Sequence, residues 1–234
     1  MQYKRVLIKI SGEALAAEKH TGYDFTFVTR VCEAVKACAD RGVQIGIVIG
    51  GGNFWRGVKD GAGKVERVSA DRMGMLATAM NCLAVCDVFR QLGADARILT
   101  AMDIQGVGER FDTRKAVEYL ERGSIVLFAC GSGHPFFSTD TAAVLRAAEI
   151  GADAILLAKN IDGVYSDDPR KNPEAVRFDA ISYDEVLARH LAVMDTTATS
   201  LAMDNSIPVL VFALAEPENI GRVLDGEKLG TLVQ

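Results

Sequence analysis

The chain has 234 residues, of which 49% are hydrophobic and 24% are charged, and its formal net charge is −5 at pH 7. This length and composition allow one ordinary hydrophobic core, so we expect a single large domain rather than two. The negative charge argues against a long basic surface for nucleic acid. A phosphate ligand must therefore be held by local positive groups and backbone amides.

The predicted elements alternate between apolar strands and amphipathic helices along the chain. In chain order, we expect a strand at 5–10, a helix at 26–41 that ends at Gly42, a strand at 43–49, a long helix from Ser69 or Asp71 to 92, and a strand at 94–99. There follow a helix near 113–121, a strand at 125–129, a helix at 141–150, a strand at 154–158, a capping box at 182–185, a helix from Asp195 or Thr196, and a strand at 208–212. This order predicts an α/β fold with a mostly parallel sheet covered on both faces.

The cysteines, histidines and apolar runs exclude several classes of protein. The chain has five cysteines and no C-x-x-C pair, so we expect reduced, buried or half-buried thiols in a cytoplasmic protein. Its three histidines lack metal-ligand spacing, and we expect no zinc held by the protein. No apolar run approaches the length of a membrane span, so neither secretion nor membrane insertion is expected.

In parallel sheets, ligands bind beyond the carboxyl ends of the strands, which directs attention to the loops there. The first such loop begins at Lys9, where the amides near Ser11 and Gly12 can line a phosphate that the lysine neutralises. The alternative is an edge lysine that snorkels to solvent.

The second loop, 50–57, has three consecutive glycines followed by Arg56, which is the composition of a phosphate cradle. It is not a Walker A loop, because the chain has no G-x-x-x-x-G-K-[ST] string. It is not a dinucleotide fingerprint either, because Trp55 stands where a third glycine is needed. The alternative is a flexible turn.

The third loop, 130–140, combines hydroxyls and glycine amides with a helix N-terminus, which favours an anion. Phe136 and Phe137 can wall a planar base there. The alternative is a capped helix start with two buried phenylalanines, in which Asp140 is only the N-cap. The fourth loop, 160–169, places Tyr165 near three acids and suits either a nucleoside or a solvated acidic turn.

Five segments together resemble one family over nearly the whole chain. They are KISGEAL at 9–15, GGGNFWRG at 50–57, DRMGMLAT at 71–78, GHPFFSTD at 133–140 and DGVYSDDP at 162–169. These strings are similar to those of bacterial uridylate kinases of the amino acid kinase superfamily. The resemblance implies a three-layer αβα sandwich formed by one domain over 1–234, with an acceptor-binding part at roughly 1–150 and a donor-nucleotide part at roughly 151–234.

The resemblance also implies an activity and its ligands. It implies a cytoplasmic homohexamer that transfers the γ-phosphoryl group of ATP to UMP in pyrimidine nucleotide biosynthesis. Mg²⁺ is implied to bind with ATP, and no metal ion is expected to be held by the protein alone. GTP and UTP are candidate effectors, although the segment 19–24 keeps only Gly22 and Asp24 of the string that lies near the GTP site in many relatives.

Carried over position by position, the resemblance assigns the site residues. The catalytic residues it implies are Lys9, Arg56 and Asp140. The residues it implies for ATP binding are Lys9, Ser11, Gly12, Gly52, Arg56, Lys159, Tyr165 and Asp168. Those it implies for UMP binding are Gly51, Asp71, Ser132, Gly133, His134, Pro135, Phe136, Phe137, Ser138 and Thr139.

General phosphoryl-transfer chemistry suggests how these residues act. A loose transition state requires mainly alignment and charge neutralisation, which Lys9, Arg56 and Mg²⁺ are expected to supply. Asp140 is expected to orient a lysine or a metal-bound water, because the phosphate of UMP is already ionised and needs no base. Asp71 has two interpretations, as a ligand of the ribose hydroxyls or as a helix cap.

Some positions depart from the family pattern, and several functions stay open. The departures are Ser132 for the common Thr, His134 for Asn, Lys159 for Thr and Ala213 for Asn. A related phosphotransferase can act on CMP or a small acid in place of UMP. The chain can also be a non-catalytic nucleotide or anion binder, or a nucleotide-sensing regulator that touches DNA through partners.

Overall fold

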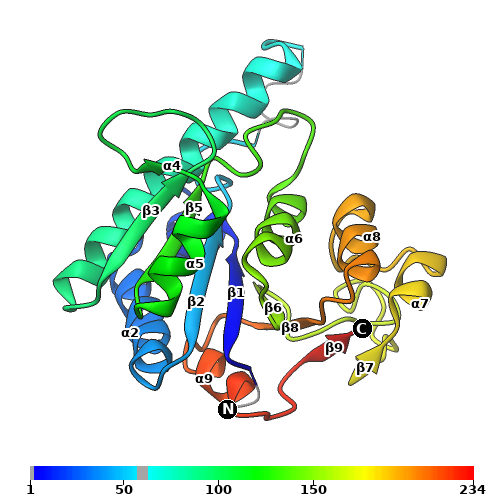
Figure 1. Ribbon diagram of the computed structural model, residues 1–234. Coiled ribbons are helices and arrows are strands. Elements are labelled where there is room, and N and C mark those ends of the chain that lie inside the picture. The colour runs from blue at the N-terminus through cyan, green and yellow to red at the C-terminus, as the bar shows by residue number, and fades with distance from the viewer. Residues whose placement is uncertain (1–2, 57–62) are drawn as a thin grey trace.

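The structure is a computed structural model that describes residues 3–56 and 63–234. Its described strands form one sheet in the order β4-β3-β5-β2-β1-β6-β8-β9-β7 (Figure 1). The strands are β1 (Arg5–Ile10), β2 (Gln44–Ile49), β3 (Ala96–Thr100), β4 (Glu109–Arg110), β5 (Ile125–Ala129), β6 (Ala154–Lys159), β7 (Ala180–Ile181), β8 (Val209–Ala213) and β9 (Thr231–Val233). The β8–β9 pair is antiparallel, and the other pairs are parallel. The expected mostly parallel sheet is confirmed.

Helices cover both faces of this sheet. They are α1 (Gly12–Ala16), the 3₁₀ helix η1 (Ala17–Lys19), α2 (Phe25–Asp40), α4 (Arg67–Gln91), α5 (Thr113–Glu121), α6 (Thr139–Ile150), α7 (Tyr183–Ala188), α8 (Thr196–Asp204) and α9 (Asn219–Leu224). Side chains of α2, α4 and α9 pack with one face of the sheet, and those of α5, α6, α7 and α8 pack with the other. The three-layer αβα architecture is therefore confirmed.

Strand β1 shows how the sequence produces these layers. Successive side chains of a strand point to opposite faces. Val6, Ile8 and Ile10 accordingly join the core beneath α2 and α4, whereas Leu7 joins the core beneath α6. Lys9 follows Leu7 on the α6 face, and β1 lies between β2 and β6 in the sheet. Lys9 is therefore not an edge lysine that reaches solvent.

The expected long helices and strands begin and end within about two residues of the observed ones. Two expected caps are wrong. Helix α4 begins at Arg67 after Glu66, so Ser69 and Asp71 lie inside its first turns. Helix α6 begins at Thr139, with Ser138 as its N-cap, because the Ser138 hydroxyl accepts a hydrogen bond from the Thr141 amide.

Helix α4 corrects the expectation that no apolar run approaches the length of a membrane span. Within the described residues it is the one helix that is long and apolar enough by length and composition. More than half of its apolar window is buried inside the fold, beside α2 and β3. Its composition is therefore also that of a core helix.

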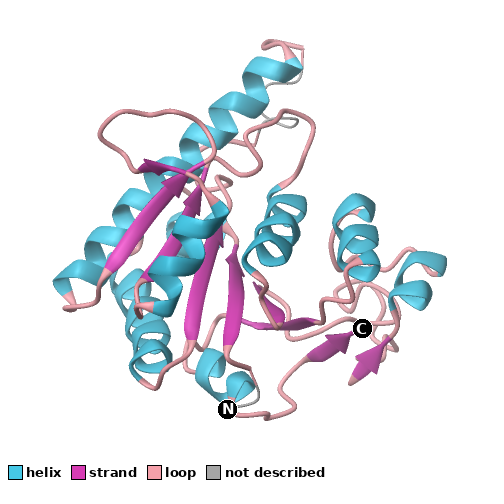
Figure 2. Cartoon of the chain, viewed as in Figure 1, coloured by secondary structure: helices cyan, strands magenta, loops and turns pink. Residues whose placement is uncertain are grey.

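The parallel strands direct the candidate loops to one edge of the sheet. β1, β2, β3, β5 and β6 run in the same direction, so the loops that follow them meet at the same edge. Figure 2 shows the loops after β1, β2, β3 and β5 near the upper ends of these strands, away from the N-terminus.

Candidate functional site

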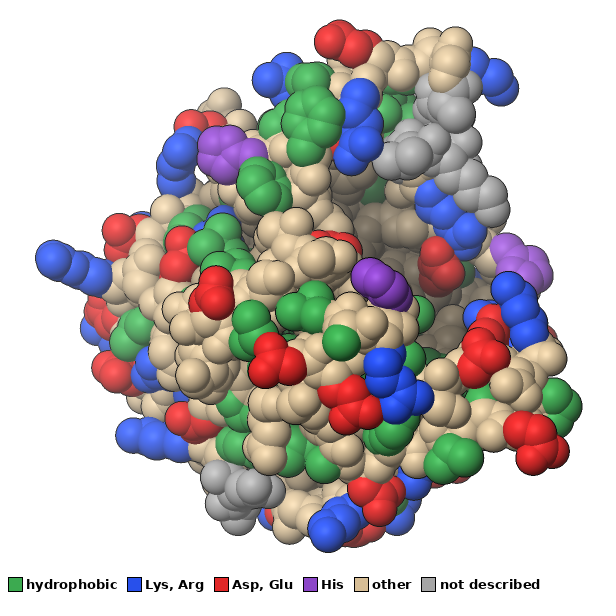
Figure 3. Space-filling view, turned by 90° about the vertical axis from the view of Figure 1, so that its right-hand side faces the viewer, with side chains coloured by type: hydrophobic (Ala, Val, Ile, Leu, Met, Phe, Trp, Pro, Cys, Tyr) green, Lys and Arg blue, Asp and Glu red, His purple; other side chains and the backbone are tan. Residues whose placement is uncertain are grey.

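A cavity of about 570 Å³ lies at this edge of the sheet. The space-filling view shows a hollow in the face that carries it (Figure 3). The cavity is formed by the loops after β1, β2 and β5 together with the first half of α4 and the start of α8. The expected site residues that line it are Lys9, Ser11, Gly12, Gly51, Gly52, Arg56, Asp71, Ser132, Phe136, Phe137, Ser138 and Thr139.

Other expected residues do not line this cavity. They are Gly133, His134, Pro135, Asp140, Lys159, Tyr165 and Asp168. Asp140 and Lys159 nevertheless lie close behind it through their interactions with Lys9, whereas Tyr165 and Asp168 belong to a separate turn. Gly57, the last residue of the glycine-rich motif, lies outside the described residues.

Lys9, Asp140 and Lys159 form a charged cluster at the carboxyl ends of β1 and β6. The Lys9 ammonium lies 2.6 Å from Asp140 Oδ1, and the two side chains are only 10% and 19% exposed. Lys159 Nζ donates a hydrogen bond to the Val193 carbonyl. Burial lowers the pKa of Lys159, the Asp140 carboxylate opposes this, and the Lys9 ammonium adds to it. The cluster thus places two cations and one anion beside the cavity.

Asp140 depends on Lys9 for the charge that compensates its carboxylate. Its Oδ1 is buried and makes no hydrogen bond of acceptable geometry in the described part of the protein, although the Lys9 ammonium is within ion-pair distance. Buried carboxylate oxygens are normally hydrogen-bonded or bound to a cation. The expectation that Asp140 is only a helix cap is wrong, because Ser138 is the N-cap and Asp140 lies in the first turn of α6.

The glycine-rich loop packs tightly between α1 and α4. A Cβ atom on Gly12 would lie 2.3 Å from the Gly50 carbonyl oxygen, and one on Gly51 would lie 2.8 Å from the Gly74 carbonyl oxygen. Trp55 donates a hydrogen bond from its indole to the Ala70 carbonyl oxygen at 2.8 Å. The loop is therefore held by defined contacts and is not merely a flexible turn.

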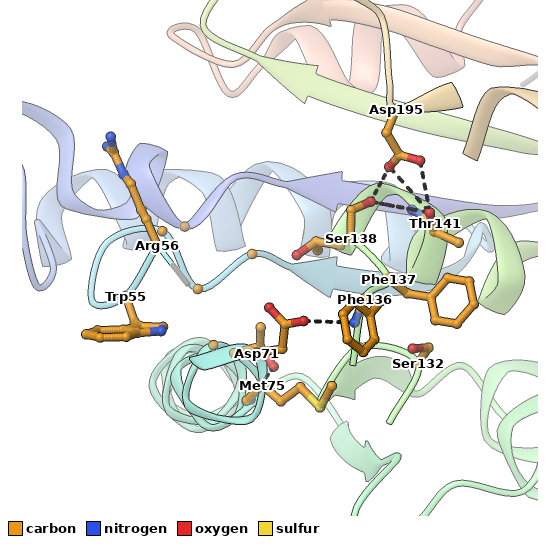
Figure 4. Close-up of a pocket in the computed structure, with 18 of the residues that line it drawn as sticks. Trp55, Arg56, Asp71, Met75, Ser132, Phe136, Phe137, Ser138, Thr141 and Asp195 are labelled. Atoms are coloured by element: carbon orange, nitrogen blue, oxygen red, sulfur yellow. Dashed lines mark hydrogen bonds between the residues drawn. The ribbon is translucent and has the colours of Figure 1, made fainter. Parts of the chain in front are cut away.

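The loop after β5, residues 130–138, is called the phenylalanine loop below. Arg56 lies at the end of the glycine-rich loop, on the opposite side of Figure 4 from Phe136 and Phe137. Its guanidinium forms an ion pair of 2.9 Å with Glu13, and both side chains are partly exposed. Glu13 Oε1 also lies close to Gly52. An exposed ion pair of this kind is weak, so an anionic ligand can compete with Glu13 for Arg56.

Asp71 connects α4 with the loop after β5. Its Oδ2 accepts a hydrogen bond of 2.8 Å from the Phe136 amide, as Figure 4 shows. Arg67 pairs with both oxygens of Asp71, and its guanidinium lies 5.1 Å from the centre of the Phe136 ring. Phe136 is 66% exposed and Phe137 is 52% exposed, so the expectation of two buried phenylalanines is wrong.

Asp195 connects the loop after β5 with the C-terminal part of the chain. Its carboxylate accepts hydrogen bonds from the Ser138 and Thr141 hydroxyls, which Figure 4 shows, and from the Ala198 amide at the start of α8. Asp195 was expected only to start a helix, which it does as the N-cap of α8. Its contribution to the cavity wall was not predicted.

Tyr165 and Asp168 lie in a turn stabilised by its own ion pairs. The Tyr165 hydroxyl donates a hydrogen bond of 2.8 Å to Asp162, which also pairs with Arg177. Asp168 pairs with Arg170. Tyr165 therefore does lie beside an acid, as expected, but the structure does not bring this turn into the cavity.

Sequence reasoning missed Glu13, Arg67 and Asp195. Arg67 lies four positions before Asp71, and a base and an acid at that helical spacing can pair. Glu13 had no such signal, because its partner Arg56 is far away in the sequence. Asp195 could not be found in this way, because its partners Ser138 and Thr141 are far away in the sequence and meet it only in the folded chain.

Known proteins are similar to this chain in sequence and in fold. The model of the amino acid kinase family matches residues 4–213. A uridylate kinase of Streptococcus thermophilus is 53% identical over 233 residues, which cover 99% of this chain and 95% of that protein. The crystal structure of the UMP kinase from Bacillus anthracis has a TM-score of 0.96 at 37% identity and covers 100% of this chain and 97% of its own. That of the UMP kinase from Ureaplasma parvum has a TM-score of 0.94 at 34% identity, with 100% of both chains covered.

Proposed function

The chain belongs to the amino acid kinase family and, within it, to the uridylate kinases, and from this premise we propose that it transfers the γ-phosphoryl group of ATP to UMP. The products are ADP and UDP, so the reaction is a step of pyrimidine nucleotide synthesis. The observation that carries the proposal is the position of Lys9, paired with Asp140, at a cavity formed by the loops after β1, β2 and β5.

The donor phosphates bind at the Lys9 side of the cavity. Ser11, Gly12 and Gly52 line the cavity there, and backbone amides of such a loop can donate hydrogen bonds to phosphate oxygens. Lys9 and Arg56 neutralise the charge that spreads over the transferring group in a loose transition state. Ligand binding exchanges the Arg56–Glu13 pair for an Arg56–phosphate pair, which is stronger because a phosphate group carries more negative charge than a carboxylate.

Mg²⁺ binding with ATP is part of the proposal, and Asp140 is the residue that fits it. Its carboxylate lies beside the cavity, is paired with Lys9 through Oδ1, and offers the hard oxygen donors that Mg²⁺ prefers. No group of three His, Cys, Asp or Glu side chains in the described segments can hold a metal ion by itself. When bound, the ion neutralises phosphate charge, whereas the protein supplies Asp140 to orient Lys9 and the ion's water.

UMP binds at the α4 side of the cavity, and the phenylalanine loop covers it. Asp71 accepts hydrogen bonds from ribose hydroxyls, as acids do in other nucleotide sites. The loop from Ser132 to Thr139 surrounds the nucleotide, where Phe136 presents an exposed ring to the planar base. The helix N-terminus at Ser138 and Thr139 favours the acceptor's phosphate.

The donor nucleoside is assigned to the C-terminal part of the chain. Lys159 extends the donor site from the Lys9–Asp140 pair towards Val193, and Tyr165 and Asp168 contact the nucleoside in the proposal. This assignment divides the domain into an acceptor part at roughly 1–150 and a donor part at roughly 151–234. The hydrogen bonds of Asp195 join the N-terminus of α6 to that of α8, which supports a division of the domain into two parts that meet at this contact.

A homohexamer in the cytoplasm completes the proposal. Large apolar side chains on one side of α4 are exposed, as expected if another subunit covers them. They are Met73, Leu76, Met80 and Leu83, spaced by three or four residues. All five cysteines are buried free thiols, and burial raises the pKa of Cys32 to about 12, which supports a reducing compartment.

Initial rates of ADP formation test the function. We expect UMP to be the preferred acceptor over CMP, acetylglutamate and carbamate at equal concentrations, and UDP to be the product. Rates measured with GTP or UTP added show whether either one is an effector. Comparable rates with CMP or with a small acid would reassign the acceptor, and the absence of transfer to any acceptor would indicate a nucleotide or anion binder.

A further inference from the structure

Arg146 is a buried charge for which the proposed chemistry has no direct use. It lies on the inner face of α6, its side chain is 5% exposed, and it does not line the cavity. Its guanidinium pairs with Glu149 and stacks on Phe111, whose ring centre is 3.9 Å away. Burial of an arginine costs free energy unless its N–H groups have partners. The hydrogen bond that Arg146 makes besides the Glu149 pair therefore indicates what the residue does.

That remaining bond goes to the loop after β5. Arg146 donates a hydrogen bond of 3.2 Å to the Gly131 carbonyl oxygen. On the other side of the same short segment, the Thr78 hydroxyl of α4 accepts a hydrogen bond of 2.9 Å from the Cys130 amide. Thr78 is itself buried, and its hydroxyl donates to the Met75 carbonyl. Two buried side chains from two helices therefore hold one dipeptide from both ends.

The dipeptide that they hold has an unfavourable backbone conformation. Cys130 has φ of 65° and Gly131 has φ of 58°, both in the left-handed region. A non-glycine residue there is disfavoured and persists only where the surroundings impose it. Further along the loop, Gly133 and Phe136 also have positive φ, at 81° and 71°. The direction in which the loop leaves β5 thus depends on the turn at Cys130 and Gly131.

We propose that Arg146 is a positioning residue that, with Thr78, fixes the turn at Cys130 and Gly131. The two residues so hold the phenylalanine loop in the conformation that binds UMP. The inference rests on the proposed function in that Ser132 to Thr139 bind UMP. Without Arg146 the turn relaxes towards ordinary backbone conformations. The loop from Ser132 to Phe136 then loses its anchor at the β5 end and keeps only the Phe136–Asp71 and Ser138–Asp195 hydrogen bonds.

Two substitutions and a matched control test this role. Arg146→Met removes the hydrogen bond to Gly131, whereas Arg146→Lys keeps the charge but lacks the fork that reaches both Glu149 and Gly131. Arg5→Met is the control, because Arg5 also donates to a carbonyl, that of Ile150, and to Gln44. Arg5 lies at the other end of β1, away from the cavity.

The first readout is amide hydrogen exchange of the loop at 130–137 in the protein without ligands. We expect exchange there to be at least about tenfold faster in Arg146→Met than in the unsubstituted chain, with a smaller effect in Arg146→Lys and none in Arg5→Met.

The second readout is steady-state kinetics. The KM for UMP is expected to rise about tenfold to a hundredfold in Arg146→Met, with little change in the KM for ATP.

The outcomes separate this inference from the proposed function. Loop exchange that matches that of the unsubstituted chain, or that rises equally in Arg5→Met, would overturn the positioning role whatever the chain phosphorylates. If the unsubstituted chain does not phosphorylate UMP, the proposed function fails, while the exchange measurement still decides the role of Arg146. Should Arg146→Met not fold, loop exchange in Arg146→Lys decides the role of Arg146. Thr78→Val, which loses the bond to the Cys130 amide, compared with Thr78→Ser, which keeps the hydroxyl, decides the role of Thr78.

Discussion

At the residue scale, the Lys9–Asp140 pair combines a stabilising contact with the charge that the proposed transfer needs. The pair is 2.6 Å long and largely buried at the end of a central strand. In such a place, removal of one partner leaves the other as an unpaired charge. The two effects, on stability and on turnover, can be separated because removal of the Asp140 charge as well relieves the unpaired carboxylate but supplies no cation at position 9.

Replacing Lys9 with Met should lower kcat for UDP formation by at least about a hundredfold, because the transition state loses its closest protein cation. It should also lower the free energy of unfolding by about 3–5 kcal/mol, because Asp140 stays buried without a partner. The double variant Lys9→Met with Asp140→Asn should regain most of the stability and none of the activity. Urea denaturation and initial rates measure the two quantities, and near-normal turnover in either variant would rule out the role of Lys9.

Asp71 shows what residue-level reasoning can and cannot predict. Its DRMGMLAT string selected it as a site residue, and the structure places it at the cavity. The string could not reveal its partner, because the Phe136 amide comes from a loop far away in the sequence. The cap that was considered for it is wrong because α4 starts at Arg67, where no side-chain cap marks the beginning in the sequence.

At the element scale, the end of β6 carries Lys159 into a partly dry environment next to Lys9. Burial and the Lys9 ammonium lower its pKa below the ordinary value of 10.5, although Asp140 opposes them. The segment that precedes α8 supplies the Val193 carbonyl as its hydrogen-bond partner. Burial and the charges of Asp140 and Lys9, which the folded chain brings to the end of β6, thus shift the pKa of this lysine.

This arrangement predicts a pH dependence of stability. Because the folded-state pKa is lowered, the unfolded chain binds more protons at Lys159 between the lowered value and 10.5. The free energy of unfolding should therefore rise with pH across that window, relative to Lys159→Met, which lacks the group. Urea denaturation of both proteins between about pH 7 and pH 10 measures the difference. Parallel curves for the two proteins would show that the Lys159 pKa is not lowered.

Elements differed in how well the sequence predicted them. The strands at Arg5–Ile10 and Ile125–Ala129 were predicted to the residue, because apolar runs between turn signals are unambiguous in a buried parallel sheet. Strands β4 and β7 have two residues each and were missed, since so short a segment has no periodicity. They and β9 depend on pairing with partners that only the fold brings near.

At the scale of the whole molecule, the exposed apolar side of α4 has the properties of a subunit contact. Its four large side chains are each 40–48% exposed, although the opposite side of the same helix is buried in the core. A monomer would leave these side chains in water at a cost proportional to their apolar area. The helix also forms one wall of the cavity through Asp71 and Thr78.

Charges on this side of α4 should therefore change the size of the assembly. We expect the unsubstituted chain to sediment as a hexamer and the double variant Met80→Glu with Leu83→Glu to sediment as smaller species. Val176→Glu is the control, because Val176 is 65% exposed and lies outside α4. Sedimentation velocity at several concentrations measures the mass, and an unchanged mass in the double variant would place the subunit contact elsewhere.

The central claim is that loops from separate strands grip two phosphate-bearing ligands end to end in one cavity. A bisubstrate analogue, with uridine and adenosine joined through a polyphosphate chain, measures this directly. We predict that it inhibits the reaction competitively with respect to both ATP and UMP, and that crystals of the complex place its phosphates at Lys9 and its uridine at Asp71. Competition with only one of the two nucleotides, or a complex that leaves Lys9 without a phosphate contact, would contradict the account.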